Sequence, residues 1–284
     1  MTDERGEHSG SGEPKVAVVT GGSSGIGLAA AEELARRGWT IALVGRDPHR
    51  LAAATDRVRA AAPDPAAVYP YRADFTVLAE VRTLAEDLRA KHPRIDVLAN
   101  NAGGAFRGRT ITVDGFELTM QVNHLAPFLL TNLLRDALAG GRMINTSSRV
   151  HTSGRLDPAD LNSSDPRAGT MTFYGSSKQA NILFATEAAR RWPDITSVSF
   201  HPGVVRTNFG NDQPLVAFFY KAGIFLATPA KGAQTLVWLA EQPLDTLVQG
   251  GYYQNRRLRT AAARATDPAL AADLWKATAA AVGL

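Results

Sequence analysis

The chain has 284 residues, of which 45% are hydrophobic and 20% charged, a balance typical of a globular protein with a full core. It contains no Cys, which excludes disulfides and thiolate metal sites, and we expect no metal ion. The net charge of +4 comes from scattered side chains, and the short basic cluster at residues 256–259 is typical of a solvated surface. No nucleic-acid partner is therefore expected.

The N-terminal stretch and the hydrophobic runs bear on the compartment. Residues 1–14 are polar and lack the apolar region of a signal peptide, so we expect a disordered tail. No apolar run approaches the roughly 18 residues of a membrane span, because residues 215–230 are interrupted by Lys221, Gly223 and Pro229. The sequence predicts a cytoplasmic protein without a transmembrane segment.

A glycine-rich turn follows the first predicted strand. Residues 15–20 are typical of a buried strand, and the segment after the turn predicts a helix that ends before Gly38. Glycines let the backbone approach a pyrophosphate, and the N-terminus of a helix offers free N–H groups to an anion. The pattern predicts a dinucleotide site whose contacts are Gly21, Ser23, Ser24, Gly25, Ile26 and Gly27.

The end of the second predicted strand, residues 40–44, bears on the choice of nucleotide. An acidic residue there would bind the ribose hydroxyls and favour NAD, but Gly45 and Arg46 follow instead. The planar guanidinium of Arg46 suits a 2′-phosphate, so NADP(H) is predicted in preference to NAD(H). Asp47 is predicted to cap the next helix, which begins at Pro48.

Two further strands, residues 67–73 and 94–99, alternate with helices in the same way. Such alternation predicts a parallel sheet with helices on both faces and a ligand crevice at the carboxyl ends of the strands. Asp74 follows one of these ends, where its carboxylate either accepts a hydrogen bond from an adenine amino group or caps a helix.

Tyr174 and Lys178 are spaced to lie on the same face of a helix predicted at residues 171–191. An ammonium beside a phenol favours the phenolate, so we expect Lys178 to lower the pKa of Tyr174 toward that of a general acid or base. The fifth predicted strand, residues 141–148, ends in Ser147 and Ser148, which point to opposite faces if the strand persists.

Taken in order, these motifs resemble those of the short-chain dehydrogenase/reductase superfamily over residues 15–284. The matching motifs are Thr20-Gly-x-x-x-Gly-Ile-Gly27, Asp74, Asn100-Asn-Ala-Gly103, a serine on the fifth strand, Tyr174-x-x-x-Lys178 and Pro202-Gly203. Residues 121–134 and 274–284 resemble the retinol-dehydrogenase-like branch, which also contains the WW-domain oxidoreductase and the light-dependent protochlorophyllide reductases. The resemblance implies an α/β fold with one Rossmann-type domain at 15–284, a doubly wound parallel sheet of about seven strands and helices on both faces.

The resemblance also implies a catalytic tetrad of Asn123, Ser148, Tyr174 and Lys178. Tyr174 would exchange a proton with the substrate oxygen, Ser148 would hydrogen-bond the same oxygen, and Lys178 would hold the ribose. Asn123 would hold a water molecule that connects Lys178 to solvent. The implied cofactor contacts outside the glycine-rich turn are Arg46, Asp74, Phe75, Asn101, Ala102, Gly103, Tyr174, Lys178, Pro202, Gly203, Val205 and Thr207.

Pro127 follows Asn123 at the spacing of a helical hydrogen bond. Because Pro has no N–H, the bond that would engage the carbonyl of Asn123 cannot form. We therefore expect a distorted helix there, with the carbonyl of Asn123 open to a water molecule.

Two segments are expected to border the substrate, residues 149–170 and 206–228. The second is rich in Phe and Leu, so it is either a mobile lid or a segment packed permanently, and the substrate is expected to be partly apolar. His151 is either a second acid/base or incidental, and His201 is expected to be structural. The helices that bear Asn123 and Tyr174 could pair between the subunits of a homo-oligomer, and the sequence neither requires nor excludes this pairing.

The sequence thus predicts an NADP(H)-dependent oxidoreductase that interconverts a carbonyl and an alcohol on a small molecule. Two alternatives remain open: reduction of a carbon–carbon double bond, and a catalytically silent NADP-binding regulatory protein. A hydrolase that uses Ser148 is disfavoured, because no Gly-x-Ser-x-Gly elbow surrounds this serine.

Overall fold

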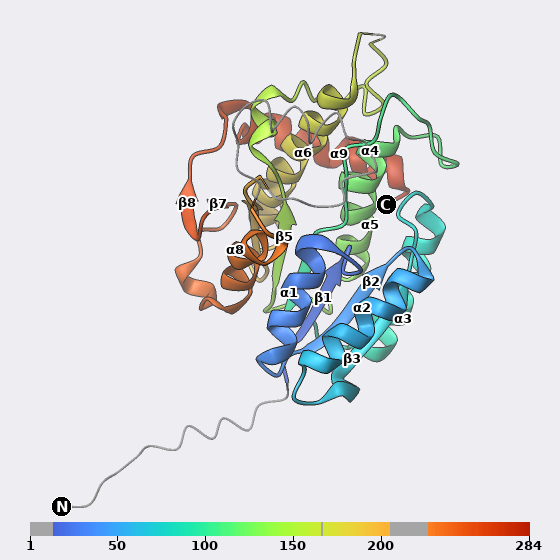
Figure 1. Cartoon of the computed structure of the whole chain (residues 1–284). Helices are drawn as coiled ribbons and strands as arrows, with labels where there is room; N and C mark the ends of the chain where they lie inside the picture. Colours follow the sequence, from blue (N-terminus) through green and yellow to red (C-terminus); the bar gives the residue numbers. More distant parts are fainter. Residues whose placement is uncertain (1–13, 166, 205–226) are drawn as a thin grey trace, which may run out of the picture.

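The computed structural model describes residues 14–165, 167–204 and 227–284, which form one eight-stranded sheet (Figure 1). The strand order is β3-β2-β1-β4-β5-β6-β7-β8, and all pairs are parallel except β7 with β8. The predicted doubly wound parallel sheet is confirmed. The strands are β1 (Val16–Thr20), β2 (Thr40–Gly45), β3 (Val68–Arg72), β4 (Val97–Asn100), β5 (Arg142–Thr146), β6 (Thr196–His201), β7 (Tyr252–Gln254) and β8 (Arg257–Arg259).

The eighth strand differs from the expected count of about seven. It contains most of the basic cluster predicted as solvated surface, and its residues are indeed exposed. Asn255 and Arg256 both have positive φ, 52° and 60°, so a two-residue turn folds β8 back on β7. The hairpin adds one antiparallel strand at the edge of the sheet.

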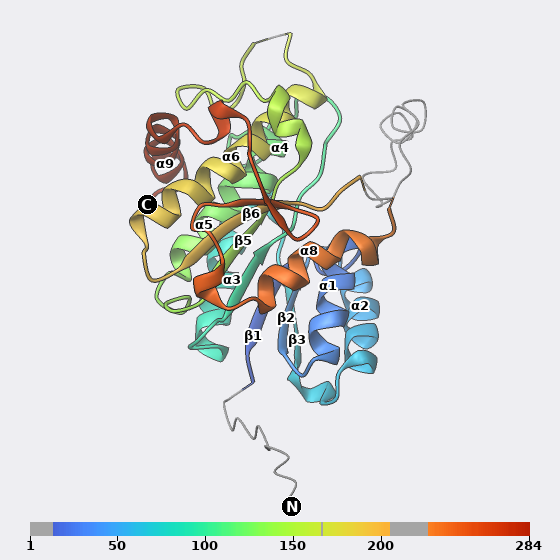
Figure 2. The ribbon, with the colours of Figure 1, turned by 90° about the vertical axis from the view of Figure 1, so that its left-hand side faces the viewer.

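The helices form two layers, one on each face of the sheet (Figures 1 and 2). Helices α1, α2 and α8 cover one face, and α3, α5 and α6 cover the other, with α9 packed on α5 and α6. Their bounds are α1 (Gly25–Arg36), α2 (Pro48–Ala61), α3 (Leu78–Lys91), α4 (Leu118–Met120), α5 (Ala126–Leu133), α6 (Thr170–Arg191), α8 (Pro229–Glu241) and α9 (Pro268–Val282). Within the described ranges, no helix combines the length and the apolar character needed to cross a bilayer.

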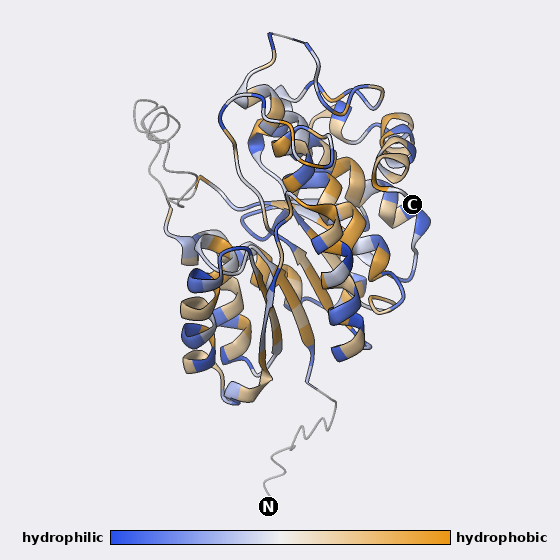
Figure 3. Ribbon diagram, turned by 90° about the vertical axis from the view of Figure 1, so that its right-hand side faces the viewer, coloured by the Kyte–Doolittle hydropathy of each residue, from blue (hydrophilic) through white to orange (hydrophobic). Residues whose placement is uncertain are grey.

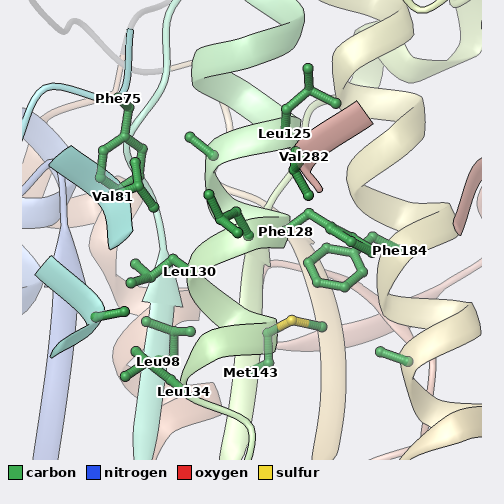
Figure 4. Close-up of a cluster of buried hydrophobic side chains, with 14 of the residues drawn as sticks. Phe75, Val81, Leu98, Leu125, Phe128, Leu130, Leu134, Met143, Phe184 and Val282 are labelled. Carbon is green, nitrogen blue, oxygen red and sulfur yellow. The ribbon is translucent and has the colours of Figure 1, made fainter. Parts of the chain in front are cut away.

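Alternate residues of the central strands place their side chains in two separate hydrophobic cores. Val18 and Leu98 point to the layer of α3, α5 and α6, and Val19 and Ala99 point to the layer of α1 and α8. Figure 4 shows the first core, where Leu98, Phe128 and Phe184 are among the labelled side chains. Apolar residues concentrate on the strands and on the inward helix faces, while the outer faces are hydrophilic (Figure 3). Because both faces of these strands are buried, their sequences are continuous apolar runs.

The helical segment before α5 is not regular. Residues Gln121–Leu125 form a π turn, in which the N–H of Ala126 donates to the carbonyl of Gln121. Such wide turns interrupt the normal helical bonding and often occur at functional sites. The predicted distortion beside Pro127 is therefore present.

Strand β1 lies between β2 and β4, so the strand order reverses on its two sides. In open α/β sheets a ligand binds outside the carboxyl ends at this switch point. The fold thus places the turn after β1 and the loops after β4 and β5 around one crevice.

Candidate active site

A cleft of about 400 Å³ lies along the carboxyl ends of the strands. It brings together most of the predicted residues: Gly21, Ser23, Ser24, Gly25, Ile26, Arg46, Asp74, Phe75, Asn101, Ala102, Gly103, Ser148, Tyr174, Lys178, Pro202 and Gly203. Gly27 and Asn123 do not line it, and Val205 and Thr207 lie outside the described residues. Gly45, Asp47 and Ser147, which the sequence names for other reasons, also line the cleft. So do residues that the sequence did not single out, namely Val44, Arg50, Ala73, Thr76, Gly104, Ala105, Phe106, Val122 and Thr146.

The glycine-rich turn at one end of the cleft is built for an anion. Gly21 has φ +65°, and a Cβ there would lie 2.8 Å from the Cα of Ala102. Ser24 is the N-cap of α1, yet its side chain makes no capping bond, and the first turn of α1 contains no acidic residue. The N–H groups of this helix end are therefore available to a phosphate.

Gly27 has a packing role in the structure, and its contact with a cofactor stays a prediction. A Cβ at Gly27 would lie 2.4 Å from the carbonyl oxygen of Gly21 and 2.5 Å from Nδ2 of Asn101. The residue is buried behind the turn and does not line the cleft. Its glycine lets α1 approach the ends of β1 and β4 closely.

Thr20 fastens the turn after β1 to the loop after β4. Its Oγ1 accepts hydrogen bonds from the backbone N–H groups of Asn101 (2.9 Å) and Ala102 (3.0 Å). Nδ2 of Asn101 in turn donates to the carbonyl of Thr20 at 3.0 Å. These bonds join the two loops into one rigid wall of the cleft.

Two arginines and two aspartates line the cleft beyond β2 and β3. Arg46 is 63% exposed, and its Nε lies 4.0 Å from Oδ2 of Asp74. Asp47 caps α2 as predicted, since it accepts a hydrogen bond from the N–H of Arg50 at 2.8 Å. Asp74 accepts one from the N–H of Thr76 at 3.0 Å, which closes a turn before α3; the N-cap of α3 is Val77, so Asp74 does not cap that helix and its contact with adenine stays a prediction. Arg50, which the sequence did not single out, adds a second cation to this end.

Tyr174 and Lys178 lie on one face of α6, with Nζ of Lys178 5.5 Å from the centre of the Tyr174 ring. Nζ donates to the carbonyl of Thr146 at 3.0 Å. Burial lowers the pKa of Lys178 to about 7. Burial also raises the pKa of Tyr174, and a hydrogen bond with Ser148 opposes this rise. The expected lowering of the Tyr174 pKa by Lys178 is thus absent in the protein alone, because burial disfavours both charged forms.

The two adjacent serines differ in their environment. Ser147 is buried, and its Oγ donates to the backbone carbonyl of Lys178 at 2.8 Å, which ties β5 to α6. Ser148 is half-buried, lines the cleft and reaches the Tyr174 side chain. Of the two serines, Ser148 is therefore the one whose hydroxyl is available beside Tyr174.

Asn123 acts as a clamp on the loop after β4. Its Nδ2 donates to the carbonyl of Gly104 (2.9 Å) and to Oγ of Ser177 (2.9 Å), while its Oδ1 accepts from the N–H of Gly104 (2.8 Å). A Cβ at Gly103 would lie 2.6 Å from Oδ1 of Asn123 and 3.4 Å from Nζ of Lys178. Only a glycine fits at this position, and its small size leaves space in front of the lysine.

These features match a known family. A model of the short chain dehydrogenases fits residues 15–214. The chain belongs to this family. A candidate daunorubicin C-13 ketoreductase of Streptomyces sp. strain C5 is 54% identical to it over 95% of this chain and 93% of that protein. Mouse retinol dehydrogenase 14 is 36% identical over 97% and 89%, which supports the retinol-dehydrogenase-like branch.

A solved structure of a short-chain dehydrogenase with its nucleotide bound has a similar fold. The crystal structure of one from Burkholderia cenocepacia, in complex with NADP, superposes with a TM-score of 0.68 and is 26% identical. The alignment covers 84% of this chain and 94% of that one. The chain is therefore an oxidoreductase of a family that binds nicotinamide cofactors, and the glycine-rich turn and the room beside Lys178 fit such a cofactor.

The segments predicted to border the substrate are described only in part. Phe106 and Val122 line the cleft and give it an apolar side, and residues 149–153 form a short 3-10 turn after β5. Most of the 206–228 segment lies outside the described residues, and with it the choice between a lid and a fixed segment. Within the part of the chain that is described, no three His, Asp or Glu side chains gather as metal ligands.

Proposed function

We propose that this dehydrogenase reduces a ketone or aldehyde on a partly apolar small molecule with NADPH, and that Ser148, Tyr174 and Lys178 carry the chemistry. The observation that supports it best is the convergence of these three side chains at one end of a cleft whose other end holds Arg46. The 54% identity with the candidate daunorubicin ketoreductase favours a ketone as the group reduced.

Each side chain has a distinct task in this reaction. When NADPH is bound, its nicotinamide would supply the hydride that reduces the carbonyl carbon. The hydroxyl of Tyr174 donates its proton to the carbonyl oxygen as negative charge develops there, and Ser148 donates a hydrogen bond to the same oxygen. Lys178, held by the carbonyl of Thr146, presents an ammonium toward the ribose and Tyr174. The raised pKa of Tyr174 keeps its proton in place for donation.

We propose that Asn123 supports Ser148, Tyr174 and Lys178 without contacting the substrate. Its side chain holds Gly104, and Pro127 has no N–H to engage the carbonyl of Asn123. A water molecule on that carbonyl would connect Lys178 to solvent, so that Lys178 could pass a proton to the Tyr174 phenolate after each turnover and recover one from solvent.

NADPH oxidation, compared with NADH, over a panel of ketones, aldehydes and enones tests the reaction class. Daunorubicin and retinal belong in the panel because relatives are named for reactions on them. Turnover of an enone with loss of its double bond, and none of a ketone, would replace carbonyl reduction with double-bond reduction. No NADPH oxidation on any member would contradict the proposal.

The acid is tested with Tyr174→Phe, which we expect to lower kcat at least 100-fold, since a positioned acid contributes roughly 10²–10⁴-fold. Tyr71→Phe is the matched control: this tyrosine is half-buried, bonds His92 at 3.0 Å and lies outside the cleft. Full turnover by Tyr174→Phe would refute the assignment.

The nucleotide preference is tested with Arg46→Ala, which we expect to reduce the NADPH-over-NADH ratio of kcat/KM about tenfold, roughly 1.4 kcal/mol. Arg57→Ala is the matched control, because Arg57 is 62% exposed against 63% for Arg46 and also pairs with a carboxylate, that of Glu32. An unchanged ratio in Arg46→Ala would show that the 2′-phosphate lies elsewhere.

A further inference from the structure

We propose that His151 is a positioning residue for Ser148, and that it acts by joining the carbonyl of Ser148 to the backbone of Ala262. The inference rests on the proposed function, since it gives His151 a role only if Ser148 contacts the substrate oxygen. Nothing in the motifs of the sequence points to this contact, because both partners of the ring are backbone atoms.

The two ring nitrogens of His151 have different partners. Nδ1 lies 2.7 Å from the carbonyl oxygen of Ser148, and the N–H of Ala262 points to Nε2 at 3.1 Å. A carbonyl only accepts and an N–H only donates, so Nδ1 must carry the hydrogen and Nε2 must be bare. The neutral ring with its hydrogen on Nδ1 is the one form that satisfies both bonds.

The surroundings of the ring favour the same neutral form. His151 is only 3% exposed, and its ring meets the ring of Tyr252 edge to face with centroids 5.1 Å apart. Burial lowers the pKa of His151. His201 provides a contrast, since it is equally buried but neither of its ring nitrogens has a hydrogen-bond partner among the described residues.

The C-terminal segment is also fastened to the chain shortly after residues 149–153, the turn that follows Ser148. Nη2 of Arg264 donates to the carbonyl of Leu156 at 2.7 Å. Ala261 and Ala265 pack with Ile182 of α6 and Tyr252 of β7 in a small apolar cluster around this junction. Ala262 and Arg264 lie beyond residues 15–214, the part of the chain that matches the family model. The chain beyond that match therefore supports the site through the 262–264 segment.

The bond from His151 matters because it anchors the backbone of Ser148, whose side chain bonds Tyr174. Oγ of Ser148 accepts from the N–H of Val150 at a long 3.4 Å, whereas its carbonyl accepts from the His151 ring at 2.7 Å and from the His151 N–H at 3.1 Å. The carbonyl fixes the peptide plane after Ser148 and hence the direction in which its side chain leaves the backbone. An error of about 1 Å in such a group can cost 100-fold in rate.

Three variants at position 151 separate the two bonds. Alanine removes both, asparagine keeps an amide near the Nδ1 position that can donate to Ser148, and glutamine reaches the Nε2 position and can accept from Ala262. We expect His151→Ala to lower kcat for ketone reduction by about 10- to 100-fold, with KM for NADPH within twofold of the wild type. His151→Asn should recover most of that loss and His151→Gln little of it.

Ala262→Pro tests the far end of the link without changing the histidine. Ala262 has φ −59°, which proline adopts readily; the substitution deletes the N–H that donates to Nε2 and puts the proline Cδ in its place, which also pushes the ring away from this end of the link. We expect kcat to fall several-fold, and the double variant with His151→Ala to be no slower than His151→Ala alone. If His151→Ala fails to fold, Ala262→Pro still tests whether the link through His151 supports Ser148.

His92→Asn is the matched control, because His92 is 4% exposed, bonds a tyrosine hydroxyl at 3.0 Å and lies outside the cleft. It should leave kcat within twofold. The inference is overturned if the His151 and Ala262 variants all keep kcat within twofold while Ser148→Ala loses 100-fold or more. If Ser148→Ala itself keeps full activity, the proposed role of the serine fails instead, and the two failures are thereby distinguished.

Discussion

Asn123→Leu is the substitution whose effect follows most directly from the structure. Leucine has nearly the same shape as asparagine but cannot replace the bonds from its amide to the N–H and carbonyl of Gly104 and to Oγ of Ser177. Asn123 is 0% exposed, so water cannot easily take over these bonds at its side. The substitution therefore leaves the loop after β4 without its clamp.

The cost can be estimated from the groups left without partners. Each buried polar group without a partner costs about 1–3 kcal/mol. Gly104 is only half-buried, and Ser177 still donates to the carbonyl of Tyr174 at 2.8 Å, so part of the loss is recovered. We expect a loss of roughly 2–5 kcal/mol, a large share of the ~5–15 kcal/mol that stabilises most proteins.

Urea and thermal unfolding of the two proteins measure this loss, at about 2–4 °C in Tm for each kcal/mol. Asn132→Leu on α5 is the matched control, since that half-buried side chain donates only one bond, to the carbonyl of Phe128 at 2.8 Å. It should cost less than ~1 kcal/mol. A loss below ~1 kcal/mol in Asn123→Leu would refute the clamp, and an unchanged KM for NADPH would show that the loop does not depend on it.

Three further predictions follow from burial and close packing. Because burial lowers the pKa of Lys178 to about 7, kcat/KM for NADPH should fall about tenfold per pH unit above that value as the ammonium is lost; a flat profile to pH 9 would contradict this. Burial lowers the pKa of His124 and of His201 to about 4 from 6.5, so the unfolded chain binds more protons in this window. Stability should be complete above pH 6.5 and fall toward pH 4 by up to ~1.4 kcal/mol per unit for each ring, and urea unfolding at pH 7 and 5 checks it. Gly27→Ala should destabilise the protein and raise KM for NADPH, because the new Cβ would lie 2.4 Å from the carbonyl oxygen of Gly21. Gly38→Ala is the control: Gly38 has φ +80° and open space around it, so this substitution should leave KM for NADPH unchanged.

The sequence predicts the sheet and the cleft well because both depend on local patterns. Apolar runs that end in glycine or in small polar residues locate the strands whose carboxyl ends form the crevice. The third strand is found despite Pro70, because an edge strand tolerates a missing donor. Strand β8 is not found, because three exposed residues carry no hydrophobic signal and only the positive φ of Asn255 and Arg256 creates the hairpin.

The features that the sequence misses depend on contacts between distant backbone atoms. His151 was open to an incidental interpretation because its partner Ala262 is 111 residues away and contributes only an N–H. The motif around Gly27 likewise does not distinguish a glycine that faces the ligand from one that lets two elements approach. In both cases the side chain is visible in the sequence, but the backbone group that gives it a role is not.

The pair of Tyr174 and Lys178 shows where a spacing argument needs the structure. The spacing places an ammonium near a phenol, and that alone favours phenolate. The structure adds burial, which lowers the pKa of Lys178 to about 7 and raises that of Tyr174, so the protein alone favours the neutral phenol. A neutral phenol is a proton donor, the form needed to reduce a carbonyl, whereas oxidation of an alcohol would need the phenolate. The spacing of Tyr174 and Lys178 therefore does not by itself set the protonation state of the phenol, because burial opposes the effect of the ammonium.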